Sequence, residues 1–302
     1  MNSGPGHHAL AILNATPDSF SDGGEVFDAE RFKTKIEHLR QGGICHFDIG
    51  AQSTAPTAQT GLSQKQEMER YQRYVFPALN LLCATGEQDL SLSFDTFRPQ
   101  VFQHIFDFLS ARGFKGEIWW NDVSGLYRQD VAAILCQAKN IRYVLCHNLV
   151  GEREKTPDHY QKSLPATDAG FLAHMQDFFT QARHFFQAQD LSAQIIFDPC
   201  FGFAKSREQN LWLLAHLPQL ILQFSNETPW LLGISRKSFL RYLVQSGLPN
   251  SQEFSIQEIF AMTEWHHAAC IALWRSKLKD YSVYYRVHQA LAVQSLLLSF
   301  PF

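Results

Sequence analysis

Side chains that could bind or transform a ligand stand at the ends of short apolar runs along this chain. They are Asn14, Asp48, Asp95, Asn121, Asp122, His147, Asp198, Lys237, Arg286 and His288. The first such stretch, 10–24, reads LAILNATPDSFSDGG and passes from apolar residues to residues that favour turns. A buried strand that ends at a polar residue and opens into a loop is how a parallel α/β protein presents a functional site.

Seven of these groups fall into two chemical sets. The first set suits a flat heterocycle with amine, ring N–H and carbonyl groups, and it comprises Asp95, Asn121, Asp198 and Lys237. The second set suits anionic oxygens, and it comprises Asn14, Arg286, His288 and the turn at 235–238. That turn leads into a predicted helix at 239–244, whose free N–H groups favour anions. A single strand-end aspartate is more often a cap or salt-bridge partner, but acids and bases that converge on one rim indicate a site.

The elements that must position these groups alternate between strand and helix. Apolar runs predict eight strands, at 9–13, 44–48, 90–95, 118–122, 141–147, 195–198, 230–235 and 281–288. Apolar residues at three-to-four spacing predict the main helices at 29–42, 64–85, 99–112, 129–138, 169–188, 208–217, 252–278 and 289–298. This order favours a single-domain α/β fold over 1–302, a (β/α)8 TIM barrel in which all strand ends surround one cavity.

Composition excludes several classes of protein. The chain has 302 residues and a net charge of −3, so it carries no electrostatic footprint for nucleic acid. No apolar run is long enough to span a membrane, and the N-terminus lacks the features of a secretory signal. The six cysteines are scattered without a C-x-x-C pair. We therefore expect reduced, mostly buried thiols and a cytoplasmic location.

A series of segments carries a family resemblance. They read NATPDSFSDGG (14–24), DIGAQSTAP (48–56), SFDT (93–96), NDVSG (121–125), DPCFGFAK (198–205), GISRKSFL (233–240) and RVH (286–288). In this order they resemble the motifs of dihydropteroate synthase, a family of pterin-binding TIM barrels. One such motif is weak evidence, whereas the whole series in order is strong. The resemblance implies condensation of 6-hydroxymethyl-7,8-dihydropterin diphosphate with p-aminobenzoate, which yields dihydropteroate for folate biosynthesis.

The resemblance also implies roles for individual residues. Four residues resemble catalytic groups of the family: Asp95, Lys237, Arg286 and His288. The substrate-binding set comprises these four and Asn121, Asp198, Phe203, Thr54, Ser235, Arg236 and Ser238. Asn14 resembles the ligand of a Mg²⁺ cofactor that accompanies the diphosphate, and segments 16–24 and 53–60 resemble loops that close over it. The family's habit of dimerising implies a homodimer.

The second of these loops departs from the family pattern. Ala55 stands where an arginine normally grips the diphosphate, a charge-assisted contact of about 1.5–3 kcal/mol. Cys200 replaces a glycine, and Gln289 replaces an aspartate. A compensating cation could come from the long segment 148–167, which holds Arg153, Lys155 and Lys162; a tolerated surface insertion is the alternative for that segment.

Three functions remain open on the sequence alone. The first is a working dihydropteroate synthase, and the second is a catalytically weak or repurposed paralogue that binds pterin. The third is a pterin-dependent methyltransferase, which has no use for diphosphate ligands; the retained RVH and SRKS segments argue against it.

Overall fold

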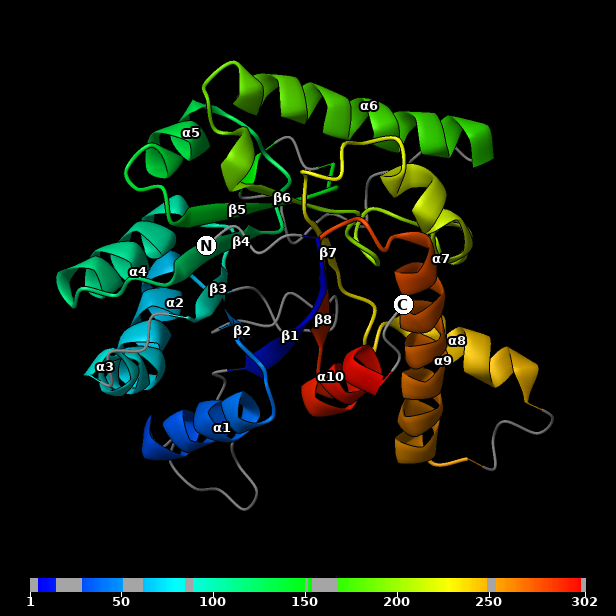
Figure 1. Cartoon of the computed structure of the whole chain (residues 1–302), viewed down its shortest axis with the longest axis horizontal. Coiled ribbons are helices and arrows are strands. Elements are labelled where there is room, and N and C mark those ends of the chain that lie inside the picture. The colour runs from blue at the N-terminus through cyan, green and yellow to red at the C-terminus, as the bar shows by residue number, and fades with distance from the viewer. Residues whose placement is uncertain are drawn as a thin grey trace.

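Eight parallel strands form a closed barrel in chain order, with β8 hydrogen-bonded back to β1 (Figure 1). The computed structural model describes residues 5–14, 29–50, 62–84, 89–149, 152–153, 168–248 and 254–299. The strands are β1 (His7–Asn14), β2 (His46–Gly50), β3 (Ser91–Asp95), β4 (Glu117–Asp122), β5 (Ile141–Cys146), β6 (Ile195–Asp198), β7 (Trp230–Leu232) and β8 (Val283–Val287). The predicted (β/α)8 barrel is confirmed.

Helices alternate with the strands and surround the barrel (Figure 1). They are α1 (Ala29–Gln41), α2 (Gln64–Arg70), η2 (Tyr71–Val75), α3 (Phe76–Ala84), α4 (Pro99–Ala111), α5 (Gln129–Leu135), α6 (Asp168–Gln187), η4 (Ser192–Gln194), α7 (Arg207–Ile221), α8 (Ser238–Gly247), α9 (Ile256–Lys277) and α10 (Ala290–Ser299). In the described ranges, none of them combines the length and hydropathy that a membrane crossing requires.

Several predicted helix bounds differ from the observed ones. The helix expected over 64–85 is divided by the π-helical turn η2, and the helix expected to end at 217 continues through Pro218 to Ile221. Side-chain caps fix several helix starts. Ser206 caps the start of α7, and Ser255 caps the start of α9. The hydroxyl of each serine accepts a hydrogen bond from the backbone N–H three residues on, and the side chain of that residue accepts one from the backbone N–H of the serine.

The two-residue period of the strands separates the barrel interior from the outer core. The interior cluster is formed by Leu10, Trp119, Val144, Ile196, Leu231 and Tyr284. The strand side chains that alternate with these belong to a much larger core, which also includes residues of the surrounding helices. Trp120 of β4, for example, stacks on Phe102 of α4. Two residues beyond Trp119, Ile196 and Tyr284, the same strand faces carry Asn121, Asp198 and Arg286. The period therefore carries polar groups to one end of the barrel.

The cysteines are all free, but the expectation of mostly buried thiols is wrong. Cys146 and Cys200 are buried, whereas Cys136 is exposed and the other three are half-buried.

Candidate active site

The carboxylate of Asp48 organises one side of the site from a fully buried position. Arg286 Nε donates to Asp48 Oδ2 at 2.6 Å, and Asn121 Nδ2 donates to Oδ1 at 3.1 Å. Ser93 Oγ donates to the same Oδ1 at 2.5 Å. One carboxylate thus fixes the side chains of three other strands, β3, β4 and β8.

Asp95 lies beside this cluster at the end of β3. Arg286 Nη2 donates to Asp95 Oδ2 at 2.9 Å, so the guanidinium bridges two carboxylates. Burial, reinforced by Asp48 and Glu67, raises the pKa of Asp95 to about 7, although Arg286 and Lys237 act in the opposite direction. The Asp95 carboxyl therefore changes charge close to neutral pH.

Two acceptors in this cluster have no hydrogen-bond partner among the residues that the structure describes. They are Asp95 Oδ1 and Asn121 Oδ1, and both atoms are buried. A buried polar atom without a partner costs free energy, so paired acceptors of this kind suit a ligand that brings N–H donors.

Asp198 and Lys237 form the other side of the cup. Asp198 Oδ1 accepts from the backbone N–H of Cys200 at 2.7 Å, and Cys146 Sγ donates to Oδ2 at 3.7 Å. Lys237 Nζ lies 4.8 Å from the centroid of the Phe203 ring. Burial raises the pKa of Asp198 and lowers the pKa of Lys237. The site thus holds an acid and a base whose charged forms are both disfavoured by burial and favoured by each other.

The two sides share one electrostatic environment. The positive charges of Lys237 and Arg286 lower the pKa of both Asp95 and Asp198, against the effect of burial. In the barrel, Asp95 is the register partner of Asn121. The structure therefore brings together the four residues that the sequence assigns to a heterocycle: Asp95, Asn121, Asp198 and Lys237.

Of the groups predicted to bind anions, the turn at 235–238 and His288 lie together between the end of β7 and the start of α8. His288 Nδ1 is 2.9 Å from Ser235 Oγ, which donates to Glu264 Oε1 at 3.1 Å. Ser238 is the first residue of α8, and no side chain in the described part of the chain caps that helix start. Its first backbone N–H groups therefore suit an anion. Arg236 adds an exposed cation next to them, on a backbone with φ of 59°.

Two predicted residues stand apart from this description. Asn14 is exposed at the end of β1, in register with Gly50, which is consistent with a place on the rim. Thr54 lies outside the described residues, as do both predicted loops.

The prediction that Asp122 and His147 line the cavity is wrong. Asp122 follows Asn121 directly, so it belongs to the opposite face of β4, where it accepts from Tyr143 Oη at 2.9 Å. His147 packs against α6, with its ring centroid 4.8 Å from that of Phe178. Both side chains belong to the shell between barrel and helices.

Arg153, one of the predicted compensating cations, is held in this shell. It forms an ion pair with Asp122, which is fully buried, and donates to Ser124 Oγ at 3.1 Å. Its guanidinium also lies 5.1 Å from the centroid of the Trp120 ring. These contacts argue against a role in binding diphosphate. Lys155 and Lys162 lie outside the described residues.

Sequence reasoning missed several supporting residues. Ser93 stands opposite Asp48 in the β2–β3 register, a pairing that a strand alignment could have found. Lys205 Nζ donates to the carbonyls of His147, Cys200 and Phe203, each at 3.0 Å, and so ties the loop after β6 to the end of β5. No local motif marks Glu264, because it reaches the site from the middle of α9.

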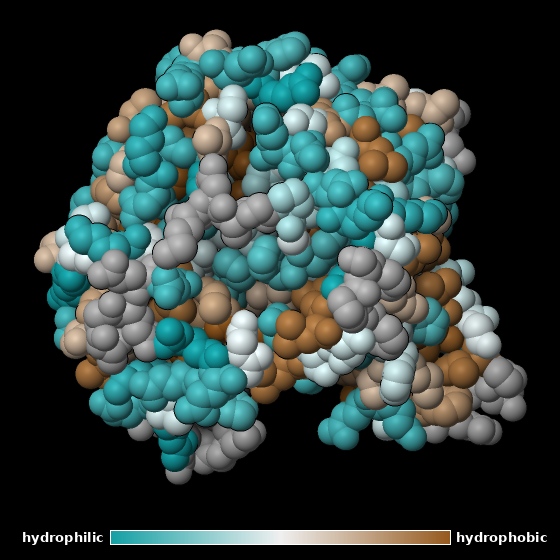
Figure 2. Space-filling view, viewed as in Figure 1, coloured by the Kyte–Doolittle hydropathy of each residue, from teal (hydrophilic) through white to brown (hydrophobic). Residues whose placement is uncertain are grey.

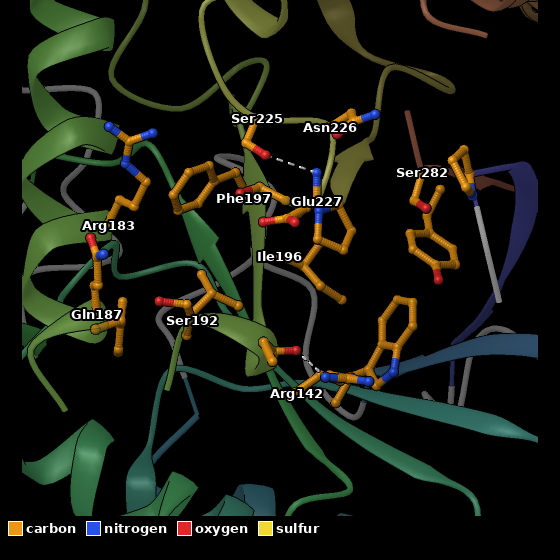
Figure 3. Close-up of a pocket in the computed structure, with 18 of the residues that line it drawn as sticks. Arg142, Arg183, Gln187, Ser192, Ile196, Phe197, Ser225, Asn226, Glu227 and Ser282 are labelled. Carbon is orange, nitrogen blue, oxygen red and sulfur yellow. Dashed lines mark hydrogen bonds between the residues drawn. The ribbon is translucent and has the colours of Figure 1, made fainter. Parts of the chain in front are cut away.

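A cavity of about 960 Å³ is formed by other parts of the molecule (Figure 3). It is lined by the starts of β4, β5, β6 and β8 and by the last turns of α6, including Arg142, Arg183 and Gln187. None of the predicted site residues within the described ranges lines it. It therefore lies at the opposite end of the barrel from the cup.

The fold and the cup define a barrel enzyme whose polar, buried floor is built at the carboxyl ends of the strands. A profile of the family described as "Pterin binding enzyme" matches residues 10–274. A dihydropteroate synthase from Synechocystis is 35% identical over 252 residues, which cover 81% of this chain and 77% of that protein. One from Staphylococcus haemolyticus is 31% identical over 236 residues, or 78% and 76% of the two chains.

Solved structures agree with these relatives. A Xanthomonas albilineans dihydropteroate synthase, solved with 4-aminobenzoic acid, superposes with a TM-score of 0.68 at 28% identity, covering 97% of this chain and 92% of that one. The chain belongs to the pterin binding enzymes and, among them, to the dihydropteroate synthases, which are transferases of folate biosynthesis.

Proposed function

We propose that this chain joins 6-hydroxymethyl-7,8-dihydropterin diphosphate to p-aminobenzoate, with release of diphosphate and formation of 7,8-dihydropteroate. The observation that carries the proposal is the pair of buried acceptors, Asp95 Oδ1 and Asn121 Oδ1, which have no partner in the described part of the chain. A pterin supplies ring N–H and amino donors in one plane. Asp198 adds a third acceptor, and Lys237 adds a donor for the pterin carbonyl.

Asp95 has a second role in the reaction. As the bond from the exocyclic methylene to the diphosphate oxygen breaks, the oxygen keeps the electron pair and the pterin becomes cationic. The ionised carboxyl of Asp95 stabilises this positive charge. The amine of p-aminobenzoate then donates its electron pair to the methylene, and the resulting ammonium group loses its proton to solvent. No protein nucleophile is required. The resemblance assigns the p-aminobenzoate ring to the neighbourhood of Phe203.

The departing diphosphate is assigned to the end of the cup formed by Arg236, Ser238, His288 and the backbone of Ser235, whose hydroxyl proton is directed to Glu264. Arg286 is a link between the two substrate parts, because its Nε and Nη2 are held by Asp48 and Asp95. A guanidinium has five N–H groups, so donors remain for a phosphate oxygen. Thr54 is assigned here from the resemblance alone.

The residues present fit a Mg²⁺ ion beside the diphosphate. Mg²⁺ prefers oxygen ligands, keeps several waters and takes few protein ligands where it also binds substrate phosphates. The exposed side chain of Asn14 offers one such oxygen at the barrel rim. When bound, Mg²⁺ neutralises charge on the diphosphate.

A turnover assay tests the proposal. Purified protein is mixed with the pterin diphosphate, p-aminobenzoate and Mg²⁺, and dihydropteroate and diphosphate are both quantified. We expect equal amounts of the two products, each dependent on p-aminobenzoate. Tight calorimetric binding of the pterin diphosphate without any product would instead identify a binding paralogue. Methyl transfer from a methylated pterin would identify the methyltransferase.

We also propose a homodimer that works in the cytoplasm. Trp265 of α9 is 77% exposed and Leu298 of α10 is 69% exposed. Figure 2 shows hydrophobic atoms over α10, whereas α1 and α6 present hydrophilic ones. Exposed apolar side chains of this kind suit contact with a second copy of the chain. Light scattering tests this: a dimer is expected, and Trp265→Glu should weaken it, whereas a wild-type monomer would contradict it. The free cysteines fit a reducing compartment.

A further inference from the structure

The hydroxyl of Ser235 lies between a carboxylate and an imidazole that come from different elements. Its Oγ donates to Glu264 Oε1 at 3.1 Å and is 2.9 Å from His288 Nδ1. The backbone N–H of His288 also donates to this Oγ, at 3.4 Å. A serine hydroxyl has a single proton. Because Ser235 donates that proton in its hydrogen bond to Glu264, the hydrogen bond between Ser235 and His288 must have Nδ1–H as its donor.

Glu264 is itself fixed in place. It is half-buried on α9, and its Oε2 lies 3.6 Å from Nδ1 of the buried His267 one turn later. Burial acts to raise the pKa of Glu264, but the contact with His267 and the hydrogen bond from Ser235 outweigh it and lower the pKa below its ordinary value. The side chain is therefore a carboxylate at neutral pH, and it remains an acceptor for Ser235.

The charges around His288 are unequal in sign. Burial, Arg236, Arg286 and Lys237 all lower the pKa of His288, which is about 4, whereas Glu264 acts to raise it. The cations come from the turn after β7 and from β8, and the acid comes from α9. Glu264 thus opposes the three cations that disfavour a protonated ring.

We propose that Glu264 is a positioning residue for the diphosphate, acting through Ser235 to hold the His288 ring with its proton on Nδ1. The inference rests on the proposed function, which assigns His288 to the diphosphate. With Nδ1–H bound to Ser235, a proton gained by the ring sits on Nε2. The ring is neutral in the free site, where its pKa is about 4, but the negative charge of a bound diphosphate next to Nε2 favours the second proton. The charged ring then offers a charge-assisted N–H to a phosphate oxygen, and the carboxylate of Glu264 stabilises that charged state.

Two variants separate the hydrogen bond from the charge. Glu264→Gln keeps an acceptor for Ser235 and removes the charge, whereas Glu264→Ala removes both. Glu227→Gln is the control, because Glu227 is exposed and lines the cavity at the other end of the barrel (Figure 3). Thermal unfolding of each variant shows whether it folds.

The readout is binding of inorganic diphosphate with Mg²⁺, measured by calorimetry, together with kcat/KM for the pterin diphosphate. We expect Glu264→Ala to weaken both by about 10–100-fold, as expected for a lost hydrogen bond to a charged group. Glu264→Gln should give a smaller loss, and Glu227→Gln none. The KM for p-aminobenzoate should be unchanged in all three.

A double-mutant cycle distinguishes positioning from a merely structural role. In a Ser235→Ala background, Glu264→Ala should have little further effect on diphosphate binding, because the bridge is already absent. Nitrogen-15 spectra of His288 should show protonated Nδ1 in the wild type and a mixture of tautomers in Glu264→Ala. Unchanged diphosphate binding in Glu264→Ala, or additive losses in the cycle, would overturn the proposal. If the wild type shows no turnover, the proposed function fails, while diphosphate binding and the spectra still decide the role of Glu264.

Discussion

Asp48→Asn is the substitution that most directly tests how the cup is held together. Asp48 is fully buried and accepts from Ser93, Asn121 and Arg286. An amide of the same shape keeps one acceptor oxygen. Its NH2 group faces a second donor, so one of the present bonds becomes a contact between two N–H groups.

The size of the effect follows from these contacts. Removing one partner of a buried ion pair costs about 3–5 kcal/mol of stability. We expect a loss of about 3 kcal/mol, at the lower end of that range, because Arg286 keeps its bond to Asp95 at 2.9 Å. The freed side chains of Asn121 and Arg286 also lose their fixed positions, and displacement of positioning groups by about 1 Å costs on the order of 100-fold in rate.

Urea unfolding and steady-state kinetics measure the two effects. Asp107→Asn is the matched control, because Asp107 is exposed on α4 and contacts only Gln103 among the interactions described, at 2.9 Å. Its unfolding free energy should change by less than about 0.5 kcal/mol. Ser93→Ala, which removes one neutral donor, should cost about 1 kcal/mol. If Asp48→Asn matched Asp107→Asn in stability and in kcat/KM, Asp48 would not be the organising group.

Three further predictions concern pH, the outer shell and the metal. The kcat/KM for the pterin diphosphate should rise with pH through about 7, because Asp95 with its raised pKa is protonated below that pH and charged above it. Asp95→Asn should abolish this rise, and a wild-type pH profile without the rise would contradict the role of Asp95. Arg153→Met should lower the unfolding free energy by about 3 kcal/mol, since it leaves the buried Asp122 without its cation, yet leave the KM for the pterin diphosphate unchanged; a tenfold rise in KM would show a direct contact with diphosphate. Chelation of Mg²⁺ should stop turnover reversibly. Asn14→Ala should raise the Mg²⁺ concentration that gives half-maximal turnover by about tenfold, which corresponds to a loss of about 1.4 kcal/mol in binding free energy. Equal Mg²⁺ dependence in Asn14→Ala and the wild type would show that Asn14 is not a ligand.

The fold could be predicted from the sequence because alternating strands and helices are compatible with few topologies. The sequence also predicted the convergence of Asp95, Asn121, Asp198 and Lys237, since a closed barrel brings all strand ends to one rim. It failed at Asp122 because adjacent residues of a strand point to opposite faces, so Asn121 and Asp122 cannot share a cavity. At His147 it failed because the side chain lies one residue past Cys146, which faces Asp198 inside the barrel.

Partners that depend on distant side chains could not be predicted from local patterns. Arg153 and Asp122 are separated along the chain, and they pair only because the tertiary fold places Arg153 beside β4. Glu264 meets Ser235 only because α9 packs beside α8. No spacing rule encodes such contacts.

Calorimetric titration of Asp198→Asn with the pterin diphosphate tests the central claim, that a pterin occupies this cup. The substitution keeps the shape of the side chain but replaces the charged carboxylate with a neutral amide. We expect the dissociation constant to rise by about 10–100-fold relative to wild type, as for a lost hydrogen bond to a charged group, while Asp107→Asn binds as the wild type does. Equal affinities in all three proteins would show that the pterin binds elsewhere.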